Sequence, residues 1–202
     1  MPTGAHRLQG IIGRCRLDED GGPMDEADKE IRSRPIPDCY WVREGLFLAG
    51  EYPGHYRTAS ARTRLQRFVD AGIRQFLDLT EDWELRPYDE LLPRLAARSG
   101  VDLAHARISI PDLCVPSVMT MRTILDAIDT GLARERPIYL HCWGGVGRTG
   151  TVVGCWLVRH GMPGSAALSQ VDAWWQSMPK RARHPRSPET DEQRNFVLTW
   201  HD

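Results

Sequence analysis

The sequence has few cysteines, almost no net charge and no long apolar run. Its five cysteines, Cys15, Cys39, Cys114, Cys142 and Cys155, form neither a CxxC pair nor a compact even-numbered framework, so a disulfide scaffold or a zinc site is not expected. The net charge of -1 argues against a polycation built to bind nucleic acid. Because no apolar run approaches the roughly 20 residues that span a bilayer, and the N-terminus has no apolar segment of the signal-peptide kind, we expect a cytoplasmic protein without a membrane span.

The chain of 202 residues is long enough to bury the core of one soluble domain. Residues 1–36 combine mixed charge with the pair Gly21-Gly22 and with Pro35, and they show little apolar periodicity. That composition is typical of a flexible leader. We therefore predict a leader over 1–36 and a folded domain over 37–202.

Short apolar segments that are typical of strands alternate with segments of helical periodicity. Strands that alternate with helices predict an α/β domain with a central, mostly parallel sheet flanked by helices. The expected strands are 46–49, 75–79, 104–110 and 138–142, and the expected helices are 61–69, 118–132, 148–160, 165–178 and a last helix that begins at Ser187-Pro188.

Residues 138–150 (IYLHCWGGVGRTG) place a cysteine between an apolar strand and a glycine-rich loop. Five residues separate Cys142 from Arg148, and the glycines among them permit a tight curl. If a helix begins near Arg148, the backbone N–H groups of the loop and the positive end of the helix converge on one anion. The sequence therefore predicts a phosphate-binding loop between a strand and a helix. The residues expected to bind the phosphate are Trp143, Gly144, Gly145, Val146, Gly147 and Arg148.

The same loop predicts a reactive thiol. Cysteine attacks phosphorus as the thiolate, and a free thiol with a pKa of about 8.5 is mostly protonated at neutral pH unless positive potential lowers that value. Arg148 adds a planar fork that grips two phosphate oxygens at once. Thr149 places a hydroxyl where it can donate a hydrogen bond to the sulfur when the sulfur leaves. We interpret Cys142 as a nucleophile.

The pattern His141-Cys142-x5-Arg148-Thr149 resembles the signature loop of the protein tyrosine phosphatases, including the dual-specificity group. The resemblance covers roughly residues 40–202 and implies a double displacement through phosphocysteine, without a metal or another cofactor. A buried structural cysteine is a weaker alternative, because packing in a core does not require a histidine, three glycines, an arginine and a threonine at fixed positions around the cysteine. A rhodanese-like sulfurtransferase is also weaker because its cysteine loop is typically shorter.

The resemblance further implies a general acid. Asp112 follows a predicted strand about 30 residues before Cys142, where these phosphatases carry the mobile loop that supplies their acid. The tryptophan found in that loop in the phosphotyrosine-specific branch is replaced by Ile110, which favours the dual-specificity branch. The alternative for Asp112 is an aspartate in a solvent-facing loop.

Two more residues receive roles from the resemblance. Gln193 lies in a segment similar to the Gln-Thr-x-x-Gln run of the family, with Glu189 in place of the first glutamine, and is expected to orient the attacking water. The alternative is an exposed glutamine on a C-terminal helix. His141 is expected to hold the loop and to help keep Cys142 ionised, which is compatible with its being a satisfied core histidine.

We therefore predict a phosphatase of phosphotyrosine, and also of phosphoserine and phosphothreonine, with a phosphoprotein or phosphopeptide as its partner. One alternative is a phosphoinositide or inositol phosphate phosphatase of the same superfamily. The loop has no lysine to meet several phosphates, although Arg107 or the basic run 180–186 could compensate. Another alternative is a phosphate-binding module without catalysis, although no essential residue is missing. The sequence leaves open the oligomeric state and a redox role for Cys114.

Overall fold

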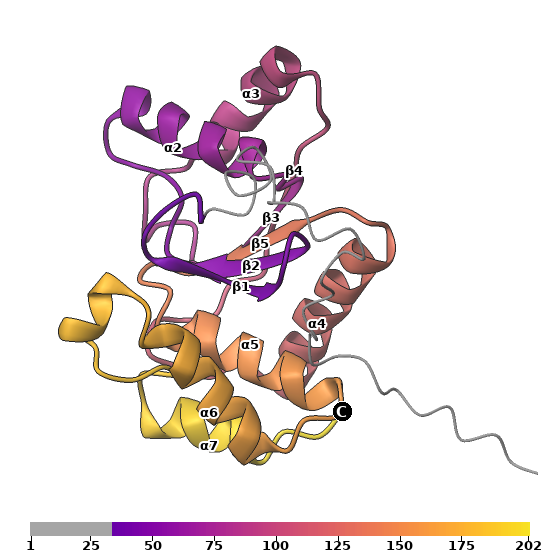
Figure 1. The fold of residues 1–202 in the computed structure, drawn as a ribbon, viewed down its shortest axis with the longest axis vertical. Helices are drawn as coiled ribbons and strands as arrows, with labels where there is room; N and C mark the ends of the chain where they lie inside the picture. The colour runs from indigo at the N-terminus through magenta and orange to yellow at the C-terminus, as the bar shows by residue number, and fades with distance from the viewer. Residues whose placement is uncertain (1–33) are drawn as a thin grey trace, which may run out of the picture.

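The computed structural model describes residues 34–202 and shows a five-stranded sheet between two helical layers (Figure 1). At one side of the sheet β1 (Cys39–Arg43) pairs antiparallel with β2 (Phe47–Gly50). The other strands are parallel, in the order β2, β5 (Ile138–His141), β3 (Gln75–Asp78) and β4 (Ala104–Arg107).

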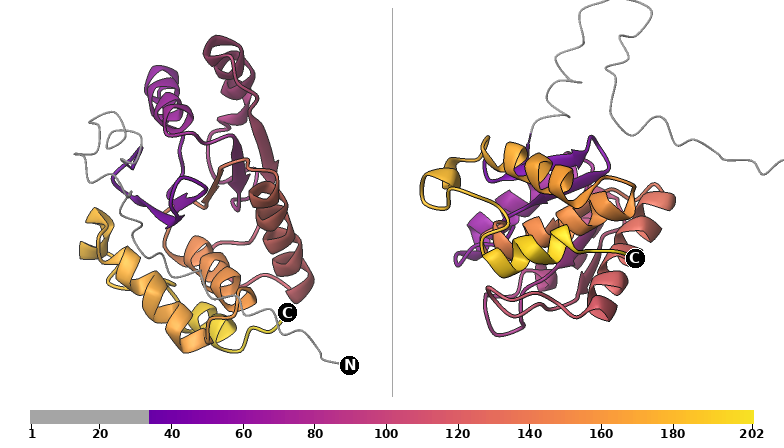
Figure 2. Two further views of the ribbon diagram at one scale, coloured as in Figure 1. Left: turned by 45° about the vertical axis from the view of Figure 1, so that its right-hand side comes forward. Right: turned by 90° about the horizontal axis from the view of Figure 1, so that it is seen from below.

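Helices cover both faces of the sheet. On one face lie α2 (Thr58–Asp70) and α3 (Leu92–Ser99), which follows the short 3-10 helix η1 (Asp89–Leu91). On the other face, as Figures 1 and 2 show, lie α4 (Val118–Ala133), α5 (Gly147–Arg159), α6 (Gly164–Trp175) and α7 (Asp191–Leu198), with η2 (Pro179–Ala182) between the last two.

Two apolar cores hold these layers together. Because successive strand residues point to opposite faces, Leu48 and Phe76 pack under α2 and α3, whereas their neighbours Phe47 and Leu77 pack under the other four helices. Both faces of the parallel strands are thus buried, which explains why the strand segments are almost continuously apolar.

The register of the sheet determines where the loops begin. Gly50, Asp78 and His141 lie side by side at the ends of β2, β3 and β5. The loops that follow these three strands therefore leave from one edge, where open α/β sheets bind their ligands.

The predicted α/β class with a mostly parallel sheet is confirmed. The structure adds β1 and α3, which the periodicity did not predict. The last helix begins at Asp191 and not at Ser187-Pro188, because Thr190 is its N-cap and forms a reciprocal capping box with Gln193.

The described residues include only the last part of the predicted leader. Its residues 1–33 lie outside the described part of the chain, whereas Ile36 is buried in the core under α2 and α3. The boundary at residue 36 stays a prediction. Within residues 34–202, no helix is both long and apolar enough to cross a membrane, and all four cysteines are free.

Candidate active site

The signature loop, residues 142–148, connects β5 to α5 at the carboxyl edge of the sheet. The side chain of Cys142 is buried, and its Sγ accepts a hydrogen bond from the backbone N–H of Gly145 at 3.3 Å. Because α5 begins at Gly147, Arg148 lies in its first turn, where unpaired N–H groups and the helix dipole favour an anion. The structure therefore places the thiol at a site built for negative charge.

Contacts with neighbouring segments fix the curl of this loop. Gly145 has a φ of +75°, and a Cβ at this position would lie 2.5 Å from the carbonyl carbon of Gly50, so only glycine fits. The N–H of Tyr52 donates to the carbonyl of Trp143 at 3.0 Å. The buried hydroxyl of Ser187 donates to the carbonyl of Val146 at 2.7 Å. The segment after β2 and the segment before α7 thus hold the loop in its curled shape.

The guanidinium of Arg148 is buried and oriented by a carboxylate. Its Nη1 and Nη2 donate to the two oxygens of Glu84 at 2.5 and 2.8 Å, and Nη1 also donates to the carbonyl of Ile110 at 2.9 Å. Burial alone lowers the pKa of Arg148, but the hydrogen bonds to Glu84 and the proximity of Cys142 raise it above its usual value, so the group stays charged. Among the described residues, nothing accepts a hydrogen bond from its buried Nε.

Asp112 reaches the same guanidinium from the solvent side. Its Oδ1 lies 3.0 Å from Nη2 of Arg148, while its side chain remains 56% exposed. The next residue, Leu113, is also exposed and has a φ of +61°. The structure therefore brings the predicted acid to the phosphate loop, in an open segment that leaves the carboxyl accessible.

His141 lies beneath the loop, completely buried. Its Nε2 is 2.7 Å from the hydroxyl of Tyr88, and its Nδ1 is 3.2 Å from the carbonyl oxygen of Cys142. Burial lowers the pKa of His141 to about 4, although Asp78 and the Cys142 carbonyl oppose that shift. A neutral ring that donates from Nδ1 and accepts at Nε2 satisfies both contacts. His141 thereby ties the main chain at Cys142 to the loop that carries Tyr88.

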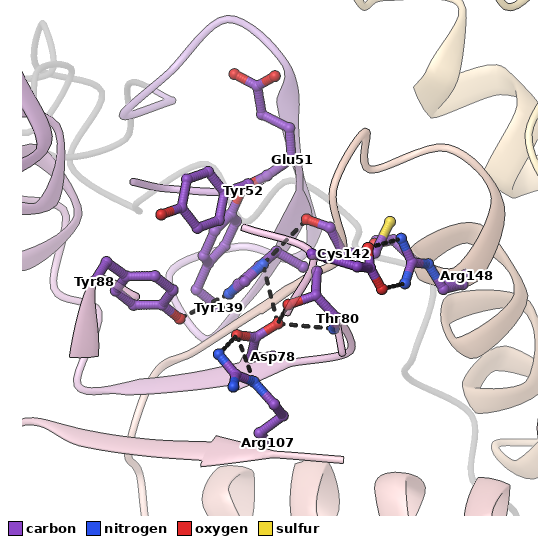
Figure 3. A network of polar contacts seen from close by, with 12 residues as sticks. Glu51, Tyr52, Asp78, Thr80, Tyr88, Arg107, Tyr139, Cys142 and Arg148 are labelled. Carbon is purple, nitrogen blue, oxygen red and sulfur yellow. Dashed lines mark hydrogen bonds and ion pairs between the residues drawn. The ribbon is translucent and has the colours of Figure 1, made fainter. Parts of the chain in front are cut away.

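The buried carboxylate of Asp78 (Figure 3) lies beside His141, with its Oδ1 3.9 Å from Nδ1 of the ring. Oδ2 of Asp78 accepts from Nη2 and Nε of Arg107 at 3.0 and 3.2 Å, and Oδ1 accepts from the hydroxyl and N–H of Thr80 at 2.7 and 2.8 Å. Burial raises the pKa of Asp78, but the nearby His105, with Nε2 at 3.6 Å, the nearby His141 and the bonds from Thr80 hold it well below its usual range. Asp78 is therefore an anion that links β3 to β4 and to the floor of the site.

The remaining predicted residues make contacts within the protein. The hydroxyl of Thr149 donates to the carbonyl of Gly50 at 3.4 Å. Gln193 is buried against Gly147. Its Oε1 accepts from the N–H groups of Glu189 and Thr190, and its Nε2 donates to the carbonyl of Cys114 at 3.2 Å. In this arrangement the Gln193 amide connects α7 to the segment that carries Asp112, and its action on a water stays a prediction.

The sequence analysis assigned no role in the site to Glu84, Asp78 or Tyr88. All three belong to β3 or to the segment that follows it, and polar residues after a parallel strand are a general signal for a ligand edge. That signal does not distinguish Glu84 from Glu81 or Asp82. Which of these acidic residues reaches Arg148 depends on how the loop packs.

Comparison with known proteins agrees with this geometry. Residues 52–162 match the family model described as polymorphic toxin system, DSP-PTPase phosphatase. The chain is 30% identical over 112 residues to phosphatidylglycerophosphate phosphatase PTPMT2 of Arabidopsis thaliana, a match that covers 54% of this chain and 46% of that protein. The chain thus spans about half the length of the curated relatives it matches.

Solved structures resemble the fold over most of the described residues. The active form of Tk-PTP is 29% identical with a TM-score of 0.58, covering 80% of this chain and 94% of that one. The catalytic domain of the PP-IP phosphatase SIW14 from S. cerevisiae shares the fold at 16% identity, with a TM-score of 0.58 and coverage of 83% and 88%. The chain belongs to the DSP-PTPase phosphatase family, within the protein tyrosine phosphatase superfamily.

Proposed function

We propose that the chain is a phosphoprotein phosphatase that works through a phosphocysteine intermediate. The observation that carries this proposal is the buried, unpartnered Nε–H of Arg148 in the loop where Gly145 donates to the sulfur of Cys142. A phosphate between these groups meets a guanidinium edge, backbone N–H groups and a nucleophile together. Since the transferring phosphoryl group spreads its charge over three oxygens, these donors stabilise the transition state.

The reaction proceeds in two displacements. First the thiolate of Cys142 attacks phosphorus, so that an S–P bond forms while the bond from phosphorus to the leaving oxygen breaks. Asp112 donates its proton to that oxygen. Then water attacks phosphorus, Asp112 accepts a proton from the water, and the S–P bond breaks to release phosphate and restore the thiolate. The exposure of Asp112 supports this role because the carboxyl can reach a leaving group on a large substrate.

Other residues act by positioning these groups. Glu84 holds the Arg148 fork, and His141 fixes the main chain at Cys142. Thr149 is proposed to donate to the sulfur, which requires that its hydroxyl leave the carbonyl of Gly50. Gln193 steadies the segment that carries Asp112 through the carbonyl of Cys114, and an action on the attacking water remains part of the proposal.

A second candidate function is the hydrolysis of an inositol phosphate or a phospholipid. One contact favours it: Nζ of Lys180 donates to the carbonyl of Gly144 at 3.4 Å, which brings the basic run 180–186 to the loop. Two of the similar proteins are named as phosphatases of phosphatidylglycerophosphate and of PP-IP. However, Lys180 is paired with Glu51, which offsets its charge. The exposed ring of Trp143 also gives the mouth an aromatic surface suited to a peptide.

A substrate panel tests the proposal. Phosphotyrosine and phosphothreonine peptides are compared with soluble phosphoinositides and inositol phosphates, using wild-type protein and Cys142→Ser. We expect turnover of both peptides, faster for phosphotyrosine because its phenolate leaves more readily, and little release of phosphate from the inositol compounds. Strict dependence on phosphotyrosine contradicts dual specificity. A strong preference for inositol compounds contradicts a protein substrate and with it the proposed cytoplasmic phosphoprotein partner.

A further inference from the structure

A cavity of about 300 Å³ lies between the first turn of α2 and the segment that leads into α3. Three arginines line it, Arg62 from α2, Arg86 from the loop after β3 and Arg94 from α3, and His55 lies beside them. Glu90 is the one acidic residue among its lining side chains. The cavity therefore carries an excess of positive charge.

Two of these arginines have no partner in the described part of the chain. Arg86 donates to the carbonyl of Tyr56 at 2.8 Å, but the side chains of Arg62 and Arg94 form neither a hydrogen bond nor an ion pair with any residue from 34 to 202. By contrast, Arg64 on the same helix pairs with Glu51 at 2.8 Å. A guanidinium carries five donors, so the two unpaired side chains present a fork geometry that matches phosphate.

The start of α2 adds to this positive potential. Its N-cap position is held by Arg57, whose side chain makes no capping hydrogen bond, and its first turn has no acidic residue. Thr58 and Ala61 of that turn line the cavity. The partial positive charge of this 13-residue helix is therefore not offset by its own side chains.

The cavity adjoins the site described above. The segment around His55 leaves β2 and the segment around Arg86 leaves β3, at the sheet edge where Cys142 follows β5. Tyr88 connects the two places, since it is one of the residues that line the cavity and its hydroxyl lies 2.7 Å from Nε2 of His141, the residue before Cys142. The same residue thus borders the basic cavity and contacts the floor of the signature loop.

We propose that this cavity binds a second phosphate group of a phosphopeptide whose first phosphate occupies the Cys142 loop. The proposal rests on the phosphoprotein phosphatase function proposed above. It identifies the preferred substrates as peptides with two phosphorylated side chains, because only these place an anion in both sites. Arg62 and Arg94 supply the donors for the second phosphate, and the start of α2 supplies additional positive potential.

Peptides with one and with two phosphorylated residues, over a series of spacings, test this assignment. At the best spacing we expect kcat/KM for the doubly phosphorylated peptide to exceed that for the singly phosphorylated peptide by about tenfold or more. A single hydrogen bond to a charged group is enough to change binding by about that factor. The double variant Arg62→Gln/Arg94→Gln should bring the ratio close to one. Arg67→Gln removes an equal charge from an exposed position on α2 outside the cavity and should keep the wild-type ratio.

A binding measurement separates this proposal from the function on which it rests. Inorganic phosphate is titrated into wild-type protein while the backbone amide signals of Thr58, Ala61 and Leu91 are followed by NMR. We expect saturable shifts at these positions that are lost in Arg62→Gln/Arg94→Gln and retained in Arg67→Gln. If no peptide is hydrolysed but these shifts occur, the phosphoprotein function is wrong while the second anion site stands. Absence of the shifts, or an equal loss of the kinetic ratio in Arg67→Gln, overturns the second site.

Discussion

The floor of the site and its mouth are built in different ways. The floor consists of Asp78, Glu84, Tyr88, His141 and Arg148, whose side chains are almost completely buried and bonded to one another or to main-chain groups. The mouth consists of Asp112, Leu113 and Trp143, each more than half exposed. One contact, between Asp112 and Arg148, joins the two regions.

This difference separates two tasks. Donors that bind a transition state act best when they are fixed in advance, and burial in a bonded network fixes them. Proton transfer to different leaving groups requires a side chain that the substrate can reach, and exposure provides that access. Substitutions in the floor should therefore change stability and activity together, whereas substitutions in the mouth should change activity alone.

The largest effect is expected at Cys142, where floor and mouth meet. Cys142→Ser should lower turnover of a small aryl phosphate by about 10⁴-fold or more, because a serine hydroxyl is not ionised and its phosphate ester does not break down readily. Binding of tungstate, measured by calorimetry, should persist because the loop N–H groups and Arg148 remain. Cys114→Ser, which alters an exposed thiol, serves as the control and should stay active. Substantial turnover by Cys142→Ser contradicts the covalent mechanism.

A smaller and selective effect is expected in the mouth. Asp112→Asn should lower kcat/KM for a phosphothreonine peptide by about 10²-fold or more, because an alkoxide must be protonated as it leaves. An activated aryl phosphate should lose much less, since its leaving group needs little protonation. The melting temperature should stay within about 2 °C of wild type, as expected for an exposed side chain. Equal losses on both substrates, or a large loss of stability, contradict the separation of mouth from floor.

A still smaller effect on activity, coupled to a loss of stability, is expected from Glu84→Gln. The substitution removes the negative partner of a buried guanidinium, so the free energy of unfolding should fall by roughly 3 kcal/mol. Turnover should fall by about tenfold because Arg148 loses its orientation. Asp82→Asn alters an exposed carboxylate two residues earlier and should change neither quantity. Urea denaturation and aryl phosphate kinetics measure both effects, and a loss of activity without loss of stability contradicts the coupling.

The same division explains what the sequence could predict. The signature loop was predictable because its nucleophile, glycines and Arg148 lie within one strand, loop and helix, where spacing alone defines the geometry. The rest of the floor was not predictable, since Asp78 and Tyr88 reach His141 only through the packing of β3 and the following loop against β5. The start of α7 was ambiguous in the sequence because both Ser187 and Thr190 can serve as an N-cap. Thr190 forms the capping box with Gln193, whereas the hydroxyl of Ser187 donates a hydrogen bond to the signature loop.

The last expected effect leaves turnover aside and is a pH dependence of stability that belongs to the floor alone. Burial holds the pKa of His141 at about 4, below the ordinary value of about 6.5. Between these values the unfolded chain binds a proton that the folded chain excludes. The stability due to neutral His141 is therefore fully present above about pH 6.5 and is lost as the pH falls to about 4, with a total of about 3 kcal/mol. The depressed pKa of Asp78 acts in the same direction, but only at lower pH.

A variant without this ionisation isolates the effect. His141→Gln should be less stable than wild type at about pH 7, because it disturbs the bonds to Tyr88 and to the carbonyl of Cys142. The difference should shrink by about 2 to 3 kcal/mol as the pH is lowered to about 4, since only wild type loses the contribution of a neutral histidine. Urea denaturation at several pH values between these limits measures the change, and Asp112→Asn should follow the wild-type curve in this range. A constant difference between wild type and His141→Gln shows that His141 does not remain neutral in the floor.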